Sequence, residues 1–253
     1  MSLYKAEAVV LRSRNLGEAD KIVTLFTYER GKVDAVAKGV RRPRSRLLGV
    51  TQLFTHGRYM LYERKSLDTI SQGEIVRAFL PLREDLYRMA HASYVAELID
   101  QTTELNDRHP QLFPLLLMTM EMLATGQQLA LTTRYFELQL MQQLGFRPHL
   151  ADCVRCGAGS ATSFSIELGG LLCDRCRSSD PAAVRLDSES LEVMRFLSRA
   201  EPARLSVLRP SKQALRILED VLPKFCASRI GRWLHSMDFL LSLSAVETQE
   251  VER

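Results

Sequence analysis

The sequence predicts a mixed α+β protein, with a small β-barrel in its N-terminal third and a helical body behind it. Three observations predict this architecture. Five short runs rich in β-branched and aromatic residues fill residues 1–80. After Pro81 the apolar residues recur at helical rather than strand spacing. Two Cys-x-x-Cys pairs then interrupt the helical pattern within residues 151–177, which indicates a small inserted module.

The N-terminal runs are separated by turn residues such as Gly31. Five short strands of this kind are typical of a closed barrel of the OB kind, and an SH3-like barrel is the alternative. We assign residues 1–80 to the barrel domain and residues 81–253 to a helical domain, with the cysteine module inserted at 151–177. The expected strands are 6–12, 21–27, 33–40, 52–62 and 67–76.

The helical body is divided by capping residues, glycines and prolines, which mark where helices start and end. Thr132 or Thr133 is expected to cap a helix that ends at Gly145. Asp187 or Ser188 is expected to cap a later helix. The remaining expected helical segments are 82–105, 115–123, one starting at Ser211, and a segment from Pro223 to Leu243.

The four cysteines of the module are Cys153, Cys156, Cys173 and Cys176, with sixteen residues between the two pairs. A two-residue spacing lets both thiolates of a pair face one point, and two such pairs complete a tetrahedral zinc site. Four sulfur ligands leave no open coordination position, so we predict one structural zinc ion rather than a catalytic one. Two disulfides or a redox-active Cys-x-x-Cys pair are the alternatives.

The residues around the cysteines also favour a zinc knuckle. Gly157 directly follows Cys156, where the chain has to turn with positive φ. A strand at 162–166 and a turn at Gly169–Gly170 predict a β-hairpin that leads into the second pair. A module of this size cannot bury a core of its own, so metal binding is expected to supply its folding free energy.

Positive charge is concentrated in the predicted barrel. The chain has 34 Lys+Arg and 30 Asp+Glu, but residues 1–80 hold 15 of the basic and only 8 of the acidic side chains. Segment 38–46 contains five cations together with Gly and Pro, and is expected to be a loop. Such a loop can neutralise several phosphates, and a solvated loop without a ligand is the alternative. The predicted nucleic-acid-binding residues are Lys38, Arg41, Arg42, Arg44 and Arg46.

Other functional classes find less support. No apolar run in the sequence approaches the ~20 residues that span a bilayer, so no membrane association is expected. The first residues lack the apolar core of a signal peptide, and zinc-binding thiolates suit a reducing compartment, so we expect a cytoplasmic protein. Common catalytic motifs are absent from the sequence, and we predict no enzymatic activity. We expect the barrel core to take most of Phe26, Tyr28, Phe54, Tyr59 and Tyr62.

The order of these parts resembles the RecO family of bacterial recombination mediators. Gly17–Thr27 is similar to the opening of that family, and Leu144–Pro148 is similar to the segment before its zinc loop. The four cysteines resemble those of its zinc-bearing members. Other similar segments are Gly31–Lys32, Ala37–Arg41, Ser45–Gly49 and Leu67–Gln72.

This resemblance implies an OB-fold that binds single- and double-stranded DNA, anneals complementary strands and helps load RecA onto strands coated by single-strand-binding protein. It also implies two direct partners, RecR and the acidic tail of single-strand-binding protein, and a bacterial, nucleoid-associated location. The residues themselves support only the DNA-binding part. An RNA- or ribosome-associated zinc-ribbon protein, and a nucleic-acid-modifying enzyme with a structural zinc, are the alternatives that the residues leave open.

Overall fold

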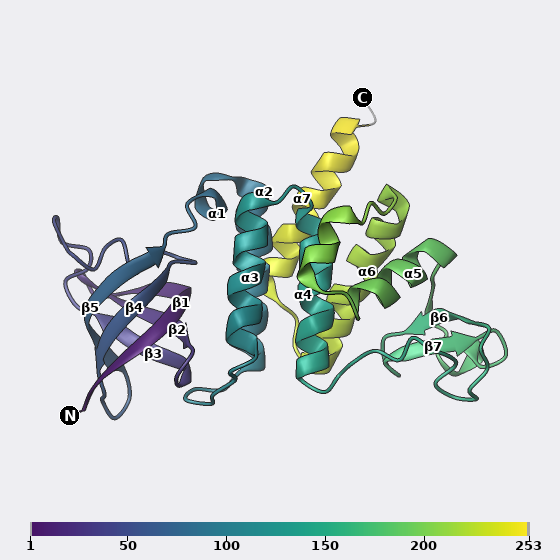
Figure 1. The fold of residues 1–253 in the computed structure, drawn as a ribbon, viewed down its shortest axis with the longest axis horizontal. Helices are drawn as coiled ribbons and strands as arrows, with labels where there is room; N and C mark the ends of the chain where they lie inside the picture. Colours follow the sequence, from purple (N-terminus) through teal and green to yellow (C-terminus); the bar gives the residue numbers. More distant parts are fainter. Residues whose placement is uncertain (1, 252–253) are drawn as a thin grey trace. The chain divides into compact units, whose positions relative to one another are not determined.

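The computed structural model describes residues 2–251, with side chains described up to residue 243. The chain forms two compact units, one made of residues up to Gln127 together with those from Leu234 onward, the other of Gln128–Trp233. The first unit holds a β-barrel with helices, and the second holds helices with a small sheet (Figure 1). The predicted α+β class is thereby confirmed. The chain changes from strands to helices near residue 80. The proposed domain division at that residue stays a prediction.

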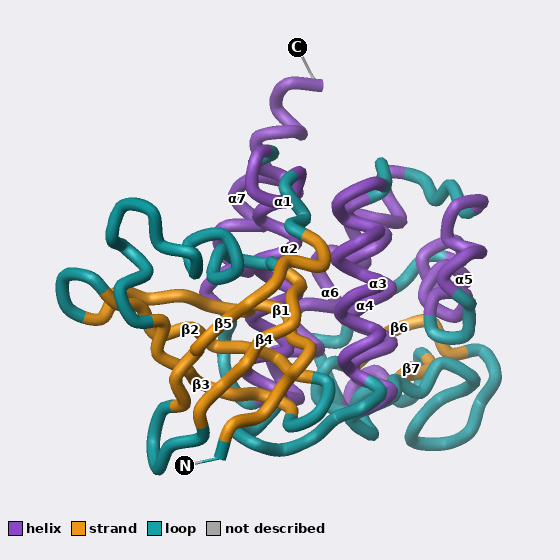
Figure 2. The backbone as a smooth tube through the Cα atoms, turned by 60° about the vertical axis from the view of Figure 1, so that its left-hand side comes forward, coloured by secondary structure: helices purple, strands orange, loops and turns teal. Residues whose placement is uncertain are grey.

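The N-terminal strands close into a barrel in the order β1-β2-β3-β5-β4, drawn in orange in Figure 2. Neighbouring strands are antiparallel except β3 and β5, which pair in parallel at Ala35 and Asp68. A closed five-stranded barrel confirms the predicted OB-like fold. The strands are β1 (Leu3–Leu16), β2 (Asp20–Thr27), β3 (Gly31–Ala37), β4 (His56–Tyr62) and β5 (Asp68–Arg77).

The predicted strand at 52–62 is confirmed only from His56 onward. Residues 52–55 form turns, and Phe54 has a positive φ of 65°. This backbone is held in place because the Phe54 N–H donates to the Val10 carbonyl at 2.9 Å. The Phe54 ring is buried with Phe26 and Tyr59, whereas Tyr28 is 43% exposed. Of the five aromatics, the barrel core cluster contains Tyr59, whereas Phe26 packs against Phe113, with ring centroids 6.3 Å apart. The prediction that the barrel core takes most of them is therefore wrong.

The barrel is joined to its own helices by a buried carboxylate. Asp100 is 8% exposed, and its side chain lies 3.2 Å from Lys32 Nζ and 3.7 Å from Arg12 Nε. Gly31 approaches the loop at Asp107 so closely that a Cβ there would lie 1.7 Å from the Asp107 carbonyl oxygen. Only glycine fits at this position, because a side chain would push the barrel away from that segment.

The helices of the first unit differ from the predicted ones at their boundaries. The expected segment 82–105 is divided, because Asp85 is extended and its side chain caps the following helix by accepting from Arg88 N at 2.8 Å. In the described part of the chain, no helix has the length and apolar character needed to cross a membrane. The helices are α1 (Pro81–Glu84), α2 (Leu86–Thr102), α3 (Leu112–Thr125) and α7 (His235–Val251), of which α7 packs on α2.

The start of α7 is capped from another helix. The Glu97 carboxylate of α2 accepts hydrogen bonds from His235 N at 3.1 Å, from Ser236 N at 2.7 Å and from Ser236 Oγ. We expect Glu97→Ala to lower the free energy of unfolding by about 1–2 kcal/mol, because helical N–H groups lose their acceptor. Urea unfolding measures this, and Glu97→Gln, which keeps one acceptor oxygen, should recover part of the loss. Equal stability of the alanine variant and the wild type would contradict the capping role.

The second unit contains α4 (Leu129–Gln143), α5 (Ser188–Leu197) and α6 (Lys212–Ile230). The predicted caps are confirmed where Asp187 accepts from Ser190 N and where Ser211 accepts from Ala214 N. The predicted cap at Thr132 or Thr133 is wrong, because α4 already begins at Leu129. The Thr133 hydroxyl instead donates to the Leu129 carbonyl at 3.0 Å, inside the helix.

The segment predicted to start at Pro223 also needs correction. Helix α6 continues through Pro223 and ends at Ile230, where it is capped by Gly231 with a φ of 76°. Proline has no N–H, so it leaves the carbonyl of Glu219 without its helical donor. Arg134 Nη1 of α4 lies 3.5 Å from that carbonyl oxygen. Packing between α4 and α6 therefore compensates for the proline, which local sequence signals do not show.

Candidate nucleic-acid interface and metal centre

The connection between β3 and β4 carries the predicted basic loop. Its first part is anchored to the tip of the β1–β2 hairpin. Gly39 N donates to Asp20 Oδ1 at 2.7 Å, and Arg41 N donates to the Ala19 carbonyl at 2.9 Å. Gly39 has a φ of 63°, which suits glycine at this turn. Residues 17–20, which matched the family pattern as a motif, thus hold the loop in place.

The same connection is also fastened to the barrel core. Val40 and Val50 are buried, on either side of the four arginines of the loop. The Tyr59 hydroxyl donates to the Val50 carbonyl at 2.7 Å, and burial raises the pKa of Tyr59. Gly73 of β5 faces Val50 so closely that a Cβ would lie 2.9 Å from Val50 Cγ2. The loop is therefore held at both ends by the barrel.

The five predicted cations all lie on the surface of this loop. Each of Lys38, Arg41, Arg42, Arg44 and Arg46 is exposed. Among the described residues none of them forms an ion pair, and only the Arg41 side chain makes a hydrogen bond, to the Gly17 carbonyl at 3.3 Å. A loop with fixed ends thus presents several uncompensated positive charges, which is the electrostatic arrangement that attracts a polyanion.

Sequence reasoning did not identify Asp20 as an anchor of this loop. In the sequence Asp20 stands out only as part of the segment that resembles the RecO family. Its anchoring role leaves no local pattern, because the two bonded groups lie nineteen positions apart in the chain. An acidic side chain beside a basic loop would suggest charge compensation. The structure shows instead that the Asp20 carboxylate binds the backbone N–H of Gly39.

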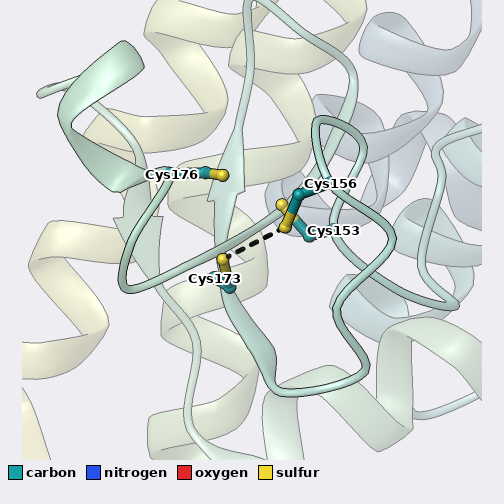
Figure 3. A group of neighbouring side chains, drawn as sticks. All are labelled: Cys153, Cys156, Cys173 and Cys176. Atoms are coloured by element: carbon teal, nitrogen blue, oxygen red, sulfur yellow. Dashed lines mark hydrogen bonds between the residues drawn. The ribbon is translucent and has the colours of Figure 1, made fainter.

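The four cysteines of the second unit converge on one point. Their sulfur atoms all lie within 4.8 Å of one another (Figure 3). Cys153 and Cys173 are buried, Cys156 is exposed and Cys176 is half-buried. The Sγ atoms of Cys156 and Cys173, one from each pair, are 3.6 Å apart (Figure 3). The two Cys-x-x-Cys pairs therefore act as one group and not as two separate sites.

The backbone around the cysteines favours thiolates at two of the positions. Burial acts to raise the pKa of Cys153, but the surrounding backbone N–H groups outweigh it and lower the pKa to about 6. The Cys176 N–H likewise lowers the pKa of Cys173. The hydrogen bond with Cys156 raises the pKa of Cys176 to about 12. Four neighbouring thiols cannot all ionise without a cation between them, so the cluster is suited to a dication.

The cluster has the dimensions that zinc requires. With Zn–S bonds of about 2.3 Å, the sulfur atoms of a regular tetrahedron are separated by about 3.8 Å. The observed limit of 4.8 Å is close to this value, so small side-chain adjustments would bring all four sulfurs to bonding distance. Cys153, Cys156, Cys173 and Cys176 would hold the ion. A set of four thiolates is typical of a structural zinc site.

The cysteines are positioned by a hairpin that is fastened to α6. The predicted hairpin is confirmed as β6 (Ala161–Ser165) and β7 (Gly170–Cys173), with β8 (Val184–Arg185) on the other side of β6. Phe164 is buried against Phe225 of α6, with ring centroids 5.6 Å apart. Arg229 Nη2 donates to the carbonyls of Ile166 and Glu167. Helix α6 of the same unit therefore supplies part of the hydrophobic core of the module.

The fold and the site define an α+β protein with two candidate modules. The barrel with its cationic loop is typical of nucleic-acid-binding proteins, and the helical unit with its four-cysteine cluster is typical of metal-binding ones. The family models of the Recombination protein O N terminal and C terminal regions match residues 1–79 and 83–238. The chain belongs to the RecO family.

Curated relatives are similar over nearly their whole length. The DNA repair protein RecO of Symbiobacterium thermophilum is 42% identical over 251 residues, covering 96% of this chain and 98% of the relative. That of Halalkalibacterium halodurans is 36% identical, covering 96% of both chains. That of Bacillus subtilis is 32% identical, covering 97% of this chain and 96% of the relative.

Proposed function

We propose that this chain is a non-enzymatic mediator of DNA repair and homologous recombination that binds single- and double-stranded DNA. One observation carries the proposal: five exposed cations, unpaired with carboxylates in the described structure, lie on a loop with anchored ends in a RecO-family barrel. Contacts to phosphates ignore base sequence, which suits a protein that acts at any gap or break. If all five cations met phosphates of a single strand, the salt slope of binding would be about −3.5.

The finer steps of the proposal follow from the family. We propose that the chain anneals complementary strands and helps load RecA onto strands coated by single-strand-binding protein. Its proposed partners are RecR and the C-terminal tail of single-strand-binding protein, with RecA acting downstream, in the bacterial cytoplasm. Annealing needs no covalent chemistry. A cationic surface that screens the repulsion between two strands, while their bases stay free to pair, lowers the barrier to association.

We propose that one zinc ion is bound by the four cysteines and has a structural role. When bound, the ion supplies folding free energy by linking the two Cys-x-x-Cys turns to each other. Cys153 and Cys173 would be its buried ligands, and Cys156 and Cys176 its more exposed ones. The surrounding N–H groups lower the pKa of Cys153 and Cys173 and so favour negative charge on these two sulfurs.

The anchored loop leads to a prediction for Asp20, whose charge and whose hydrogen bond to the loop should affect DNA affinity in opposite directions. Asp20→Ala removes a negative charge next to the cations, so electrostatics alone would strengthen DNA binding. We expect it instead to weaken single-strand binding about three- to tenfold, because Gly39 N loses its acceptor and the loop gains conformational freedom. Fluorescence anisotropy with a labelled dT oligonucleotide measures this.

The matched control is Asp20→Asn, which removes the same charge but keeps an acceptor oxygen for Gly39 N. This variant should bind as tightly as the wild type or more tightly. Tighter binding by Asp20→Ala would contradict the anchoring role and leave Asp20 as a purely electrostatic neighbour.

The experiment that tests the proposed function is annealing of two complementary oligonucleotides, each coated with single-strand-binding protein, at moderate salt and without ATP. We expect the wild-type chain to accelerate annealing. No acceleration, despite tight binding to the bare strands, would overturn the mediator proposal. Repeating the titrations with RNA of the same sequence tests the RNA-binding alternative, because a marked preference for RNA would favour an RNA-binding protein.

A further inference from the structure

Exposed aliphatic side chains border the cationic loop of the barrel on both sides. Leu16, the last residue of β1, is exposed and precedes Gly17, whose carbonyl accepts the hydrogen bond from the Arg41 guanidinium. Leu48 follows Arg46 by two positions and is 47% exposed. The proposed phosphate contacts use only the cations, so they leave these apolar side chains without a role.

Leu48 has an exposed side chain on a fixed backbone. Its N–H donates to the Ser45 carbonyl at 3.3 Å. Its own carbonyl accepts from Gln52 Nε2 at 3.0 Å and from Thr51 Oγ1 at 3.3 Å. Two positions further on, Val50 is buried in the barrel core. The Leu48 side chain is therefore presented to solvent by a backbone attached to the barrel, which distinguishes it from a leucine on a free loop.

Strand β5 adds a second apolar side chain at this place. A Cβ at Gly49 would lie 3.2 Å from Ile75 Cδ1, so the turn that follows the cationic loop touches β5 here. Ile75 is itself exposed. Leu48 and Ile75 therefore both lie next to Gly49 and form a small exposed aliphatic patch beside the cations.

Among the described residues of the barrel, no exposed aromatic ring lies next to the loop. Tyr28 follows the end of β2 that is away from the β1–β2 tip, and its ring centroid lies 5.7 Å from that of Phe113. Tyr62 pairs with Leu3 at the start of β1. The other aromatic rings of the barrel are buried, or covered by Arg30 in the case of the first: Tyr4, Phe26, Phe54 and Tyr59. Stacking on an aromatic ring, the usual way to hold unpaired bases, is therefore not provided beside these cations.

We propose that the barrel loop binds duplex DNA from the minor groove and inserts Leu48 between two neighbouring base pairs, which kinks the duplex. Proteins that bind the minor groove often combine cationic side chains with an aliphatic wedge that partly unstacks one base step. The arginines of the loop supply the cations, and Ile75 supports the wedge from β5. Leucine has no π-face on which a base could stack, so this patch favours a wedge over a stacking platform.

The proposal rests on the proposed function, since it needs the loop to bind DNA. It deepens that function by adding a distortion of the duplex that phosphate contacts alone do not produce. Bending the duplex costs deformation energy, which the extra contacts of the bent form offset. This cost is lowest at flexible pyrimidine–purine steps, so we expect the kink at a TA step in preference to a stiff A-tract.

The test uses the full-length chain and a duplex of about 20 base pairs with a central TA step. One version carries a donor and an acceptor dye at its two ends, and another carries 2-aminopurine in place of the adenine of that step. Saturating wild-type protein should raise both the energy transfer and the 2-aminopurine fluorescence, because the ends approach each other and the central step unstacks.

Leu48→Ala should lose at least about half of both signals at saturation and bind the duplex about three- to tenfold more weakly. Its affinity for a dT oligonucleotide should change less than about twofold, because the phosphate contacts of the loop are kept. Leu48→Met keeps a long apolar side chain and should retain both signals. The matched control is Leu3→Ala, because Leu3 is 48% exposed at the end of β1 that is away from the loop, and it should behave like the wild type.

The outcomes separate the wedge from the proposed function. Duplex bound at saturation without either signal would overturn the wedge and leave the proposed function intact. An equal loss of affinity for single strands in Leu48→Ala would also overturn the wedge, because Leu48 would then contact unpaired bases. Absence of binding to both duplex and single strands would overturn the proposed function, and the wedge with it.

Discussion

Replacing Arg41, Arg42 and Arg44 together with glutamate is expected to weaken binding to single-stranded DNA by about two orders of magnitude. The three side chains are exposed and form no ion pairs in the described structure, so the substitution breaks no internal ion pair. Each lost phosphate contact removes about 0.7 from the salt slope for single strands, so the slope should fall by about 2. Titrations at several salt concentrations measure both quantities.

The matched control changes three exposed cations elsewhere on the barrel, Lys5, Arg64 and Lys65, to glutamate. This control carries the same net charge as the loop variant. A protein attracted to DNA only by its overall charge would lose affinity equally in both variants. Equal losses, or an unchanged salt slope in the loop variant, would remove the loop from the DNA-binding site.

Cys153→Ser is expected to cause the largest structural loss in the second unit. Structural zinc contributes about 10–16 kcal/mol of apparent binding free energy in zinc-finger peptides, and the removal of one ligand opens the site. We expect zinc affinity to fall at least about a hundredfold and the β6–β7 hairpin to lose protection from amide exchange. Metal content by mass spectrometry and hydrogen exchange measure the two effects.

The matched control is Cys226→Ala, because Cys226 lies buried in α6 and outside the cluster. Its pKa is raised by burial, and it behaves as a small apolar side chain. This variant should keep one zinc ion per chain while losing some stability from the removed sulfur. A Cys153→Ser protein that retained its metal and its melting temperature would show that Cys153 is not a ligand.

The features that depended on short-range chemistry could be read from the sequence. The spacing of Cys153 and Cys156, the glycine after them and the hairpin before the second pair are confirmed as a cluster with its supporting turn. The five barrel strands, apart from residues 52–55, and the caps at Asp187 and Ser211 are also confirmed, because alternation and capping act over only a few residues. The nine-residue loop of 38–46 likewise lies between strands as expected.

Long-range contacts account for most of what sequence reasoning missed. Helix α6 continues through Pro223, and Arg134, on another helix, approaches the Glu219 carbonyl that has lost its helical donor. The start of α7 is capped by Glu97, which lies 138 positions before His235 in the chain. In each case the partner of a backbone group is chosen by packing, and packing leaves no local pattern in the sequence.

The sequence by itself determined the charge of the basic loop and the spacing of the four cysteines, the residues that we propose carry the chemistry of this protein. Only the tertiary structure decided how these residues are held and what else lies on the surface. It placed Asp20 under the loop, fastened the cysteine hairpin to Phe225, and brought Ile75 next to the turn that follows the loop. The physical reason is that residue type sets charge and ligand preference, whereas direction and proximity depend on contacts made across the fold.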